Sequence, residues 1–200
     1  MTFSSATAAE TPEVAPAVQM RLFVGLKISP EIATELARIV AVLEKLPVRL
    51  VKPADIHLTL VPPWNEASPQ GAIEKIRQVA SGCGAFSLIV QHVGYGPQPR
   101  RPRLIWADCA ANDEITALHA ALLHAFGRTE ERAFQPHVTL ARIRAGGPAI
   151  ARRHPIDRQL SLTQRVESIE LFQSPPPGGA GYRVLASLRF GEPVGSAPAA

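Results

Sequence analysis

Apolar positions along this chain follow two periods, one typical of strands and one typical of helices. Short apolar runs bounded by proline, glycine or polar residues indicate strands, whereas apolar residues three and four apart indicate one face of a helix. The strand pattern predicts a strand opened by Pro136 and further strands over residues 21–28, 48–52, 56–61, 86–95, 104–109, 160–172 and 182–190. The helix pattern predicts three helices, over residues 30–43, 69–80 and 113–126.

Local signals mark the ends of two of these helices. Ser29 stands before Pro30 at the start of the first helix, Asn112 precedes the third, and Gly127 follows it. Serine and asparagine cap free backbone N–H groups, proline fits the first helical position, and glycine is favoured just past the end. Strands and helices alternate twice, and each pass contains one long helix. We therefore predict one α+β domain with two lobes over residues 21–190, with loose tails over residues 1–20 and 191–200.

The composition is that of a globular chain. Of the 200 residues, 46% are hydrophobic and 19% are charged, and no apolar run approaches the ~20 residues needed to cross a bilayer. The N-terminus lacks the positive start and the continuous apolar region of a secretory signal. Cys83 and Cys109 form no C-x-x-C pair, so no disulfide framework is expected and a reduced cytoplasmic compartment fits best.

The charge is biased toward arginine. The net charge is +4, and 17 of the 21 basic residues are arginine. Because arginine forms forked hydrogen bonds to phosphate groups, this bias is compatible with a polyanionic ligand. It is equally compatible with the amino-acid usage of a GC-rich genome. Two basic groups either follow an RNA backbone or form a solvated surface; they are Arg100, Arg101 and Arg103, and Arg144, Arg152 and Arg153.

One four-residue phrase, His-x-Thr-Leu, occurs twice, at His57 and at His137. Residues two apart in a strand share a face, so each histidine points the same way as its threonine, Thr59 or Thr139. The intervening apolar residues fill the other face. In a duplicated fold the two strands would converge, and the cleft between them would hold two imidazoles and two hydroxyls.

Two histidines that face each other across a small substrate suit phosphodiester chemistry. A neutral imidazole takes a proton from the attacking water or hydroxyl, and a protonated imidazole gives one to the departing oxygen. Threonine hydroxyls donate to non-bridging phosphate oxygens, and a nearby arginine neutralises charge that develops in the transition state. This assignment explains why a strand of otherwise apolar residues carries polar residues on one face.

These motifs resemble those of the two-histidine (2H) phosphoesterase superfamily, and specifically the bacterial RNA 2′,3′-cyclic phosphodiesterases, also called the 2′-5′ RNA ligase family. The resemblance runs from about Arg21 to Phe190. It is carried by R-L-F-V-G-L at 21–26, V-K-P-A-D-I-H-L-T-L at 51–60, R-P-R-L-I-W at 101–106 and F-Q-P-H-V-T-L-A-R at 134–142. It implies two pseudo-symmetric lobes, each with an antiparallel sheet and flanking helices, around a central cleft.

The resemblance also implies an activity and a set of site residues. Family members hydrolyse 2′,3′-cyclic phosphate ends of RNA to 2′-phosphates, some join RNA halves reversibly through 2′-5′ bonds, and none needs a metal or other cofactor. By position, His57 would be the proton donor to the leaving 3′ oxygen and His137 the proton acceptor. Thr59 and Thr139 would contact the phosphate. Arg142 would assist them, but it lies five residues after His137 and needs a strand end or a bulge to reach the cleft.

Two further features concern the rim of the cleft. Phe23 and Phe134 are candidates for stacking on a base, although core packing is the alternative for each. After the first motif the family often shows F-L-G, whereas this chain has Val61 followed by Pro62, Pro63 and Trp64. We expect this departure to affect which substrate binds more than the reaction that is catalysed.

Three hypotheses for the function stay open. The first is metal-independent cyclic phosphodiesterase activity on RNA ends. The second keeps the histidine pair but acts on small cyclic nucleotides, 2′-5′ oligonucleotides or ADP-ribose cyclic phosphate. The third is an RNA-binding module without catalysis. A zinc site is not expected, since His119 and His124 lie five apart on one helix. We expect a monomer without a protein partner.

Overall fold

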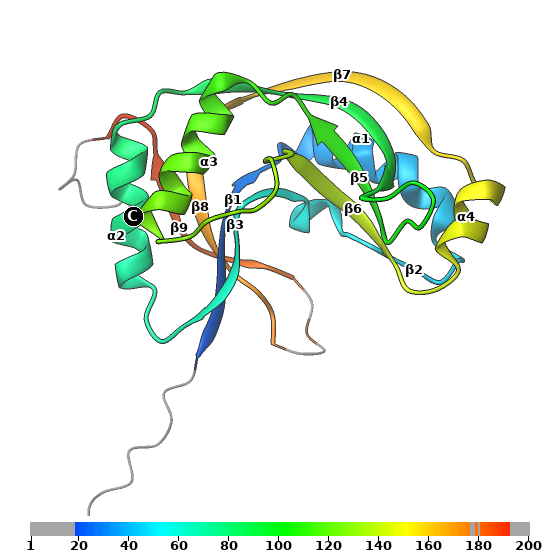
Figure 1. Ribbon diagram of the computed structural model, residues 1–200, viewed down its shortest axis with the longest axis horizontal. Coiled ribbons are helices and arrows are strands. Elements are labelled where there is room, and N and C mark those ends of the chain that lie inside the picture. Colours follow the sequence, from blue (N-terminus) through cyan, green and yellow to red (C-terminus); the bar gives the residue numbers. More distant parts are fainter. Residues whose placement is uncertain (1–18, 177–178, 180, 193–200) are drawn as a thin grey trace, which may run out of the picture.

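The computed structural model describes residues 19–176, 179 and 181–192, and within these residues the strands form one antiparallel sheet (Figure 1). The strand order is β7-β4-β5-β6-β3-β1-β8-β9, and the short β2 also pairs with β6. The strands are β1 (Met20–Lys27), β2 (Val48–Leu50), β3 (His57–Glu66), β4 (Phe86–Gly96), β5 (Leu104–Cys109), β6 (His137–Ile143), β7 (Asp157–Val166), β8 (Ser168–Gln173) and β9 (Arg183–Arg189).

The sheet has two equivalent halves that meet between β3 and β6. One half runs outward as β3, β1, β8 and β9, and the other as β6, β5, β4 and β7. The strand–helix–strand order β1, α1, β3 of the first half corresponds to β5, α3, β6 of the second. The predicted α+β class with two pseudo-symmetric lobes is therefore confirmed, and the two lobes share one hydrogen-bonded sheet.

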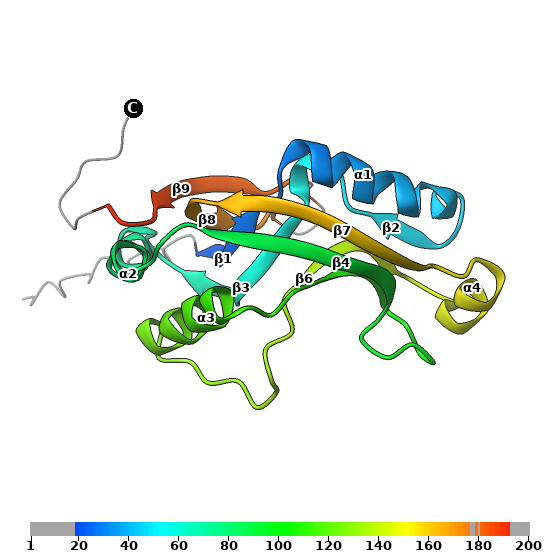
Figure 2. The same cartoon turned by 90° about the horizontal axis from the view of Figure 1, so that it is seen from above.

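Four α-helices occur in the described part of the chain; three of them pack against strands of the sheet, and the fourth, α4, lies at one end of it (Figure 2). They are α1 (Pro30–Val40), α2 (Gln70–Ser81), α3 (Asp113–Ala125) and α4 (Gly147–Arg153), with the 3-10 turns η1 (Ala41–Leu43) and η2 (Pro53–Asp55). Helix α1 lies against β6 and helix α3 against β3, so each covers the central strand of the opposite half. The two halves thereby share one core.

The predicted helix caps are present. The Ser29 side chain accepts a hydrogen bond from the Ile32 backbone N at 3.4 Å, and Asn112 accepts one from the Ile115 N at 3.0 Å. Each cap provides an acceptor for an N–H group that has no partner within the helix. Both helices therefore begin where the sequence places them.

Two elements differ from the predicted ones. The segment predicted as one strand over residues 160–172 is two strands, β7 and β8, separated at Glu167. Strand β7 pairs with β4 at one edge of the sheet, whereas β8 pairs with β1 in the other half. The arginine-rich connection before them contains the helix α4, which the sequence pattern did not predict. Apolar and polar residues are interspersed throughout residues 160–172, so the pattern alone contains no sign of the change of partner.

Strand β3 continues past its predicted end at Val61 to Glu66. Pro62 and Pro63 lie where the register between β1 and β3 shifts, between the pairs Val24–Val61 and Leu22–Trp64. A proline lacks the backbone N–H that a regular ladder uses, and an irregular stretch tolerates that loss. Of the predicted tails, only Gln19, Met20, Gly191 and Glu192 are among the described residues, and Met20 already belongs to β1.

Candidate active site

The two His-x-Thr motifs lie side by side at the centre of the sheet. Leu58 of β3 is directly paired with Val138 of β6, and both are fully buried. The antiparallel register, extended by one residue each way, sets His57 opposite Thr139 and Thr59 opposite His137. All four are partly exposed on the face opposite the core. The structure therefore brings the predicted histidines and threonines together in one patch.

A bulge follows each motif, at equivalent positions in the two halves. In β3, Thr59 pairs with Gly25 and Val61 with Val24, which leaves Leu60 as the extra residue. In β6, Thr139 pairs with Trp106 and Ala141 with Ile105, which leaves Leu140 as the extra residue. An extra residue reverses the alternation of side chains beyond it.

This reversal decides the position of Arg142. Beyond the bulge, Arg142 pairs with Leu104, which lies on the same face of β5 as Trp106, the partner of Thr139. Arg142 is therefore exposed on the face of the sheet that carries the two His-x-Thr motifs, which we call the cleft face. The sequence analysis required a bulge for this residue to reach the cleft, and the structure contains one.

Both imidazoles are held in the same way. The Nδ1 atom of His57 lies 2.7 Å from the Asp55 carbonyl oxygen, and that of His137 lies 2.8 Å from the Gln135 carbonyl oxygen. A carbonyl oxygen only accepts, so each Nδ1 carries a hydrogen and donates it. Each Nε2 is then the atom that takes up or releases a proton. The two-residue step from carbonyl to histidine is the same in both motifs.

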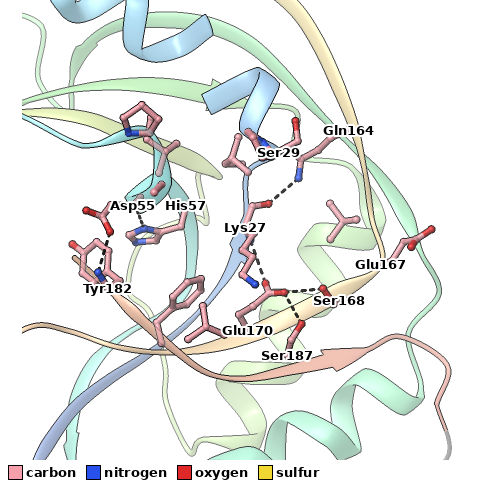
Figure 3. A pocket seen from close by; sticks show the side chains of 18 of the residues that line it. Lys27, Ser29, Asp55, His57, Gln164, Glu167, Ser168, Glu170, Tyr182 and Ser187 are labelled. Atoms are coloured by element: carbon pink, nitrogen blue, oxygen red, sulfur yellow. Dashed lines mark hydrogen bonds between the residues drawn. The ribbon is translucent and has the colours of Figure 1, made fainter. Parts of the chain in front are cut away.

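Aromatic rings surround His57 on several sides (Figure 3). Its ring centroid lies 4.8 Å from that of Phe23, 5.5 Å from Phe172 and 4.8 Å from Tyr182. Burial lowers the pKa of His57 below its ordinary value, and the nearby charges of Arg142 and His137 act in the same direction. The hydrogen bond to Asp55 acts against this shift. Burial therefore favours the neutral form of His57 in the free protein.

The surroundings of His137 are more open and more polar than those of His57. Its ring lies 4.5 Å from that of Trp106, and its strand partner on the outer side is Asp108. The Asp108 carboxylate accepts from the Gln135 side chain at 3.1 Å and contacts His92 at 3.2 Å. His92 in turn reaches Asp157 at 2.7 Å.

His92 therefore lies between two carboxylates. Its hydrogen bonds to Asp157 and Asp108 raise its pKa above the ordinary value, although partial burial opposes this. The charged form of His92 links β4 to β5 and β7, the strands that carry the two aspartates. This link supports the strand next to His137.

The two candidate stacking residues are engaged within the protein. Phe23 is only 2% exposed, and its ring stacks on Phe172 with centroids 4.8 Å apart. Phe134 stacks on His119 at 3.7 Å. Phe23 thus packs against His57 and has no free face for a base. Both positions favour the packing alternative over a base-stacking role.

A cavity of about 710 Å³ opens beside His57, on the side toward β1 and β8 (Figure 3). Glu170 lines it and is almost fully buried; its carboxylate accepts from Ser168, Ser187 and the Lys27 backbone N. Tyr182 lies at the opposite side of His57 from Lys27, and its backbone N donates to Asp55. The volume suits a ligand the size of one nucleotide.

Apart from His57, the sequence analysis did not identify the residues that line this cavity. Glu170 and Tyr182 belong to the C-terminal part of the chain, which reaches His57 only because β8 pairs with β1. In the sequence Glu170 stands between Ile169 and Leu171, and this alternation does not distinguish a buried glutamate from one that faces solvent. Only the strand order reveals it.

Neither Cys109 nor His119 has surroundings suited to nucleophilic or metal chemistry. Burial raises the pKa of Cys109 to about 12, which disfavours the thiolate that a nucleophile needs. His119 is buried against Phe134 and lies 3.5 Å from Glu130. In the part of the chain that the structure describes, no group of three or more histidine, cysteine, aspartate or glutamate residues is arranged to hold a metal ion. Nor does any described helix have the length and apolarity to span a membrane.

The fold and the paired His-x-Thr strands define a 2H phosphoesterase. The family model of the 2′-5′ RNA ligase superfamily matches residues 28–174, and the chain belongs to that superfamily. A curated RNA 2′,3′-cyclic phosphodiesterase from Archaeoglobus fulgidus is 26% identical over 136 residues, which cover 66% of this chain and 77% of the relative. The chain is accordingly an enzyme of the 2H phosphoesterase family, as its motifs predict.

Solved structures share the fold. A crystal structure of a protein from Thermus thermophilus matches with a TM-score of 0.72 and 24% identity, covering 86% of this chain and 98% of that one. Escherichia coli LigT complexed with 3′-AMP matches with a TM-score of 0.69 and 19% identity, covering 88% of this chain and all of LigT. These likenesses confirm the bilobal α+β architecture.

Proposed function

We propose that this protein hydrolyses the 2′,3′-cyclic phosphate at the end of an RNA chain to a 2′-phosphate, without a metal ion. The observation that supports the proposal is the pairing of Leu58 with Val138, which puts the two His-x-Thr motifs on adjacent strands with their histidines and threonines on one face of the sheet. The relative from Archaeoglobus fulgidus, named an RNA 2′,3′-cyclic phosphodiesterase, supports the same substrate class.

In this mechanism the Nε2 atom of His137 takes a proton from water as the water oxygen attacks phosphorus. The bond between phosphorus and the 3′ oxygen breaks, and the Nε2–H of His57 gives its proton to that oxygen. The 2′ ester bond stays intact, so the product is a 2′-phosphate. Each proton transfer of this kind typically contributes ~10²–10⁴ in rate.

The other candidate site residues stabilise the negative charge on the reacting phosphate. The hydroxyls of Thr59 and Thr139 donate hydrogen bonds to the non-bridging oxygens, and Arg142 balances the negative charge that grows on them. The lowered pKa of His57 disfavours its charged form in the free protein. A bound phosphate anion acts in the opposite direction, because an anion stabilises a neighbouring imidazolium. Substrate therefore helps to supply the proton that His57 donates.

The same two histidines would also catalyse the reverse reaction, with their roles exchanged. A 2′-5′ RNA joining reaction would need His57 as the acceptor and His137 as the donor, by microscopic reversibility.

The cavity beside His57 favours a second candidate substrate class, since about 710 Å³ accommodates a single nucleotide. Small cyclic nucleotides or ADP-ribose cyclic phosphate are therefore the alternative substrates.

The test uses an oligoribonucleotide that ends in a 2′,3′-cyclic phosphate, incubated with the protein in excess EDTA. The expected product carries a 2′-phosphate, and His57→Ala and His137→Ala each lower kcat by ~10²-fold or more. His124→Ala, at a histidine on α3 outside the cleft, is the control and keeps full activity. Turnover retained in either motif variant, or RNA binding without turnover in the unaltered protein, would contradict the proposal.

A further inference from the structure

A second arginine lies beside Arg142 on the cleft face. Arg49 of β2 is the direct partner of Arg142 in the β2–β6 register, between the pairs Val48–Ile143 and Leu50–Ala141. Directly opposed residues of an antiparallel pair point to the same face. Since Arg142 is on the cleft face, Arg49 is there too, and both side chains are exposed.

This pair is unfavourable in the free protein. Like charges directly opposite each other in a sheet repel, and a carboxylate nearby would relieve that repulsion. Among the ion pairs within 4 Å that the described residues form, none includes Arg49 or Arg142. The two guanidinium groups therefore present concentrated positive charge to an anion in the cleft.

The arginine pair also lies close to the His-x-Thr motif of β6, just beyond its C-terminal end. Arg142 follows Thr139 by three residues on β6, but the bulge shortens this to the two steps from Trp106 to Leu104 on the partner strand, roughly 7 Å at about 3.3 Å per residue. Its side chain can lean back toward the reacting phosphate, and its charge already acts on His57. Arg49 lies on β2, which pairs with the edge of β6 opposite β5, the same edge that β3 occupies at Val138. An anion bound by Arg49 is thus a neighbour of the reacting phosphate.

We propose that Arg49, together with Arg142, binds the phosphodiester that precedes the terminal nucleotide of the substrate. This inference rests on the proposed function and extends it to substrate length. A cyclic mononucleotide has one phosphate and leaves Arg49 without a partner. An RNA chain supplies the second phosphate, and the forked guanidinium is well suited to bind it. The arginine pair therefore selects chain ends over free nucleotides.

Further basic residues lie at the same end of the sheet. The Arg103 carbonyl accepts from the Ile143 N, and the Arg144 N donates to the Pro47 carbonyl, so both residues flank the β2–β6 pair. Both are exposed. They extend the positive charge beyond Arg49 in the direction that a longer chain would take.

The experiment compares two substrates with the same terminal nucleoside, adenosine 2′,3′-cyclic phosphate and a trinucleotide ending in it. For Arg49→Gln we expect kcat/KM on the trinucleotide to fall about 10-fold, the effect of one lost charge-assisted hydrogen bond. On the mononucleotide we expect less than a twofold change. Arg38→Gln on α1 removes the same charge from an exposed site on another element and leaves both values unchanged.

The outcomes separate this inference from the proposed function. An equal fall on both substrates, or no fall on either, contradicts the role of Arg49 while leaving the phosphodiesterase function intact. If the unaltered protein hydrolyses neither substrate, the proposed function fails instead. Binding then tests Arg49 independently, with a fluorescent trinucleotide that carries a terminal 2′-phosphate. Loss of one phosphate contact lowers the slope of log K against log salt by about 0.7, and an unchanged slope for Arg49→Gln overturns the inference.

Discussion

Leu58 and Val138 are directly paired across β3 and β6, and each is the middle residue of a His-x-Thr motif. Both side chains are fully buried, so the geometry of the cleft face depends on how the core packs beneath it. The same pair joins the two halves of the sheet. The arrangement of the two motifs and the junction between the lobes therefore both depend on this contact.

This dependence predicts a large loss of stability when the contact is truncated. We expect Leu58→Ala to lower the free energy of unfolding by about 2–5 kcal/mol, because it removes buried methyl groups and leaves a cavity. Urea denaturation measures the change. Val42→Ala, at a side chain that is 63% exposed, is the control and should change stability by less than about 0.5 kcal/mol. A small effect at Leu58 would show that the pair does not support the junction.

The two histidines should respond differently to a better leaving group. A cyclic substrate with sulfur in place of the 3′ oxygen releases a thiolate, which needs no proton donor. If His57 is the donor, His57→Ala should recover most of its lost activity on this substrate, whereas His137→Ala should not. Single-turnover rates on the oxygen and sulfur substrates give the comparison. Recovery in His137→Ala alone would reverse the two roles.

The charge of Arg142 lowers the pKa of His57, so its removal should raise that pKa. In Arg142→Gln the imidazolium of His57 loses a repulsive neighbour, and its charged form becomes easier to reach. NMR titration of the histidine ring protons measures the shift. Arg38→Gln, on the exposed surface of α1, serves as the matched control. A His57 pKa that stays constant or falls in Arg142→Gln would place Arg142 outside the cleft.

Gly25 allows β1 to approach the first motif closely. It pairs with Thr59, and a Cβ atom added there would collide with the Leu58 carbonyl oxygen. We expect Gly25→Ala to cost about 1–3 kcal/mol, as overpacking does, and to lower kcat because β3 must move. In contrast, Gly71→Ala on α2 meets no neighbouring atom and should stabilise the helix by about 0.5–1 kcal/mol. Thermal unfolding should therefore give a lower Tm for Gly25→Ala and a higher Tm for Gly71→Ala than for the unaltered protein. Shifts of the same sign would contradict this prediction.

His92 should make stability depend on pH. Its pKa is raised in the folded protein, so its contribution is fully present below the unfolded value of about 6.5 and is lost as the pH rises through the raised folded value. The difference in Tm between the unaltered protein and His92→Asn should therefore be larger at pH 5.5 than at pH 8.5. A difference that does not vary with pH would mean that the two aspartates do not stabilise the charged ring.

Local sequence patterns predict much of the candidate site. The step of two residues in His-x-Thr makes each histidine share a face with its threonine, because strand side chains alternate. Ser29 and Asn112 cap helices for an equally local reason, since each side chain bonds a backbone N–H three residues ahead. The repeated motif also indicated a duplicated fold before any tertiary contact was known.

Other features depend on which strands become neighbours. Arg142 reaches the cleft through the bulge at Leu140, and Arg49 joins it through the β2–β6 register. Tyr182 and Phe172 enclose His57 because β8 returns to pair with β1, although the sequence pattern shows one continuous strand from residue 160.

The sequence by itself determined the two His-x-Thr strands, the caps and the α+β class, because these follow from interactions between residues a few positions apart. The tertiary structure decided the bulges, the aromatic enclosure of His57 and the arginine pair. These follow from hydrogen bonds and packing between strands distant in the chain. No local pattern specifies such partners, since the same apolar alternation fits several neighbours equally well.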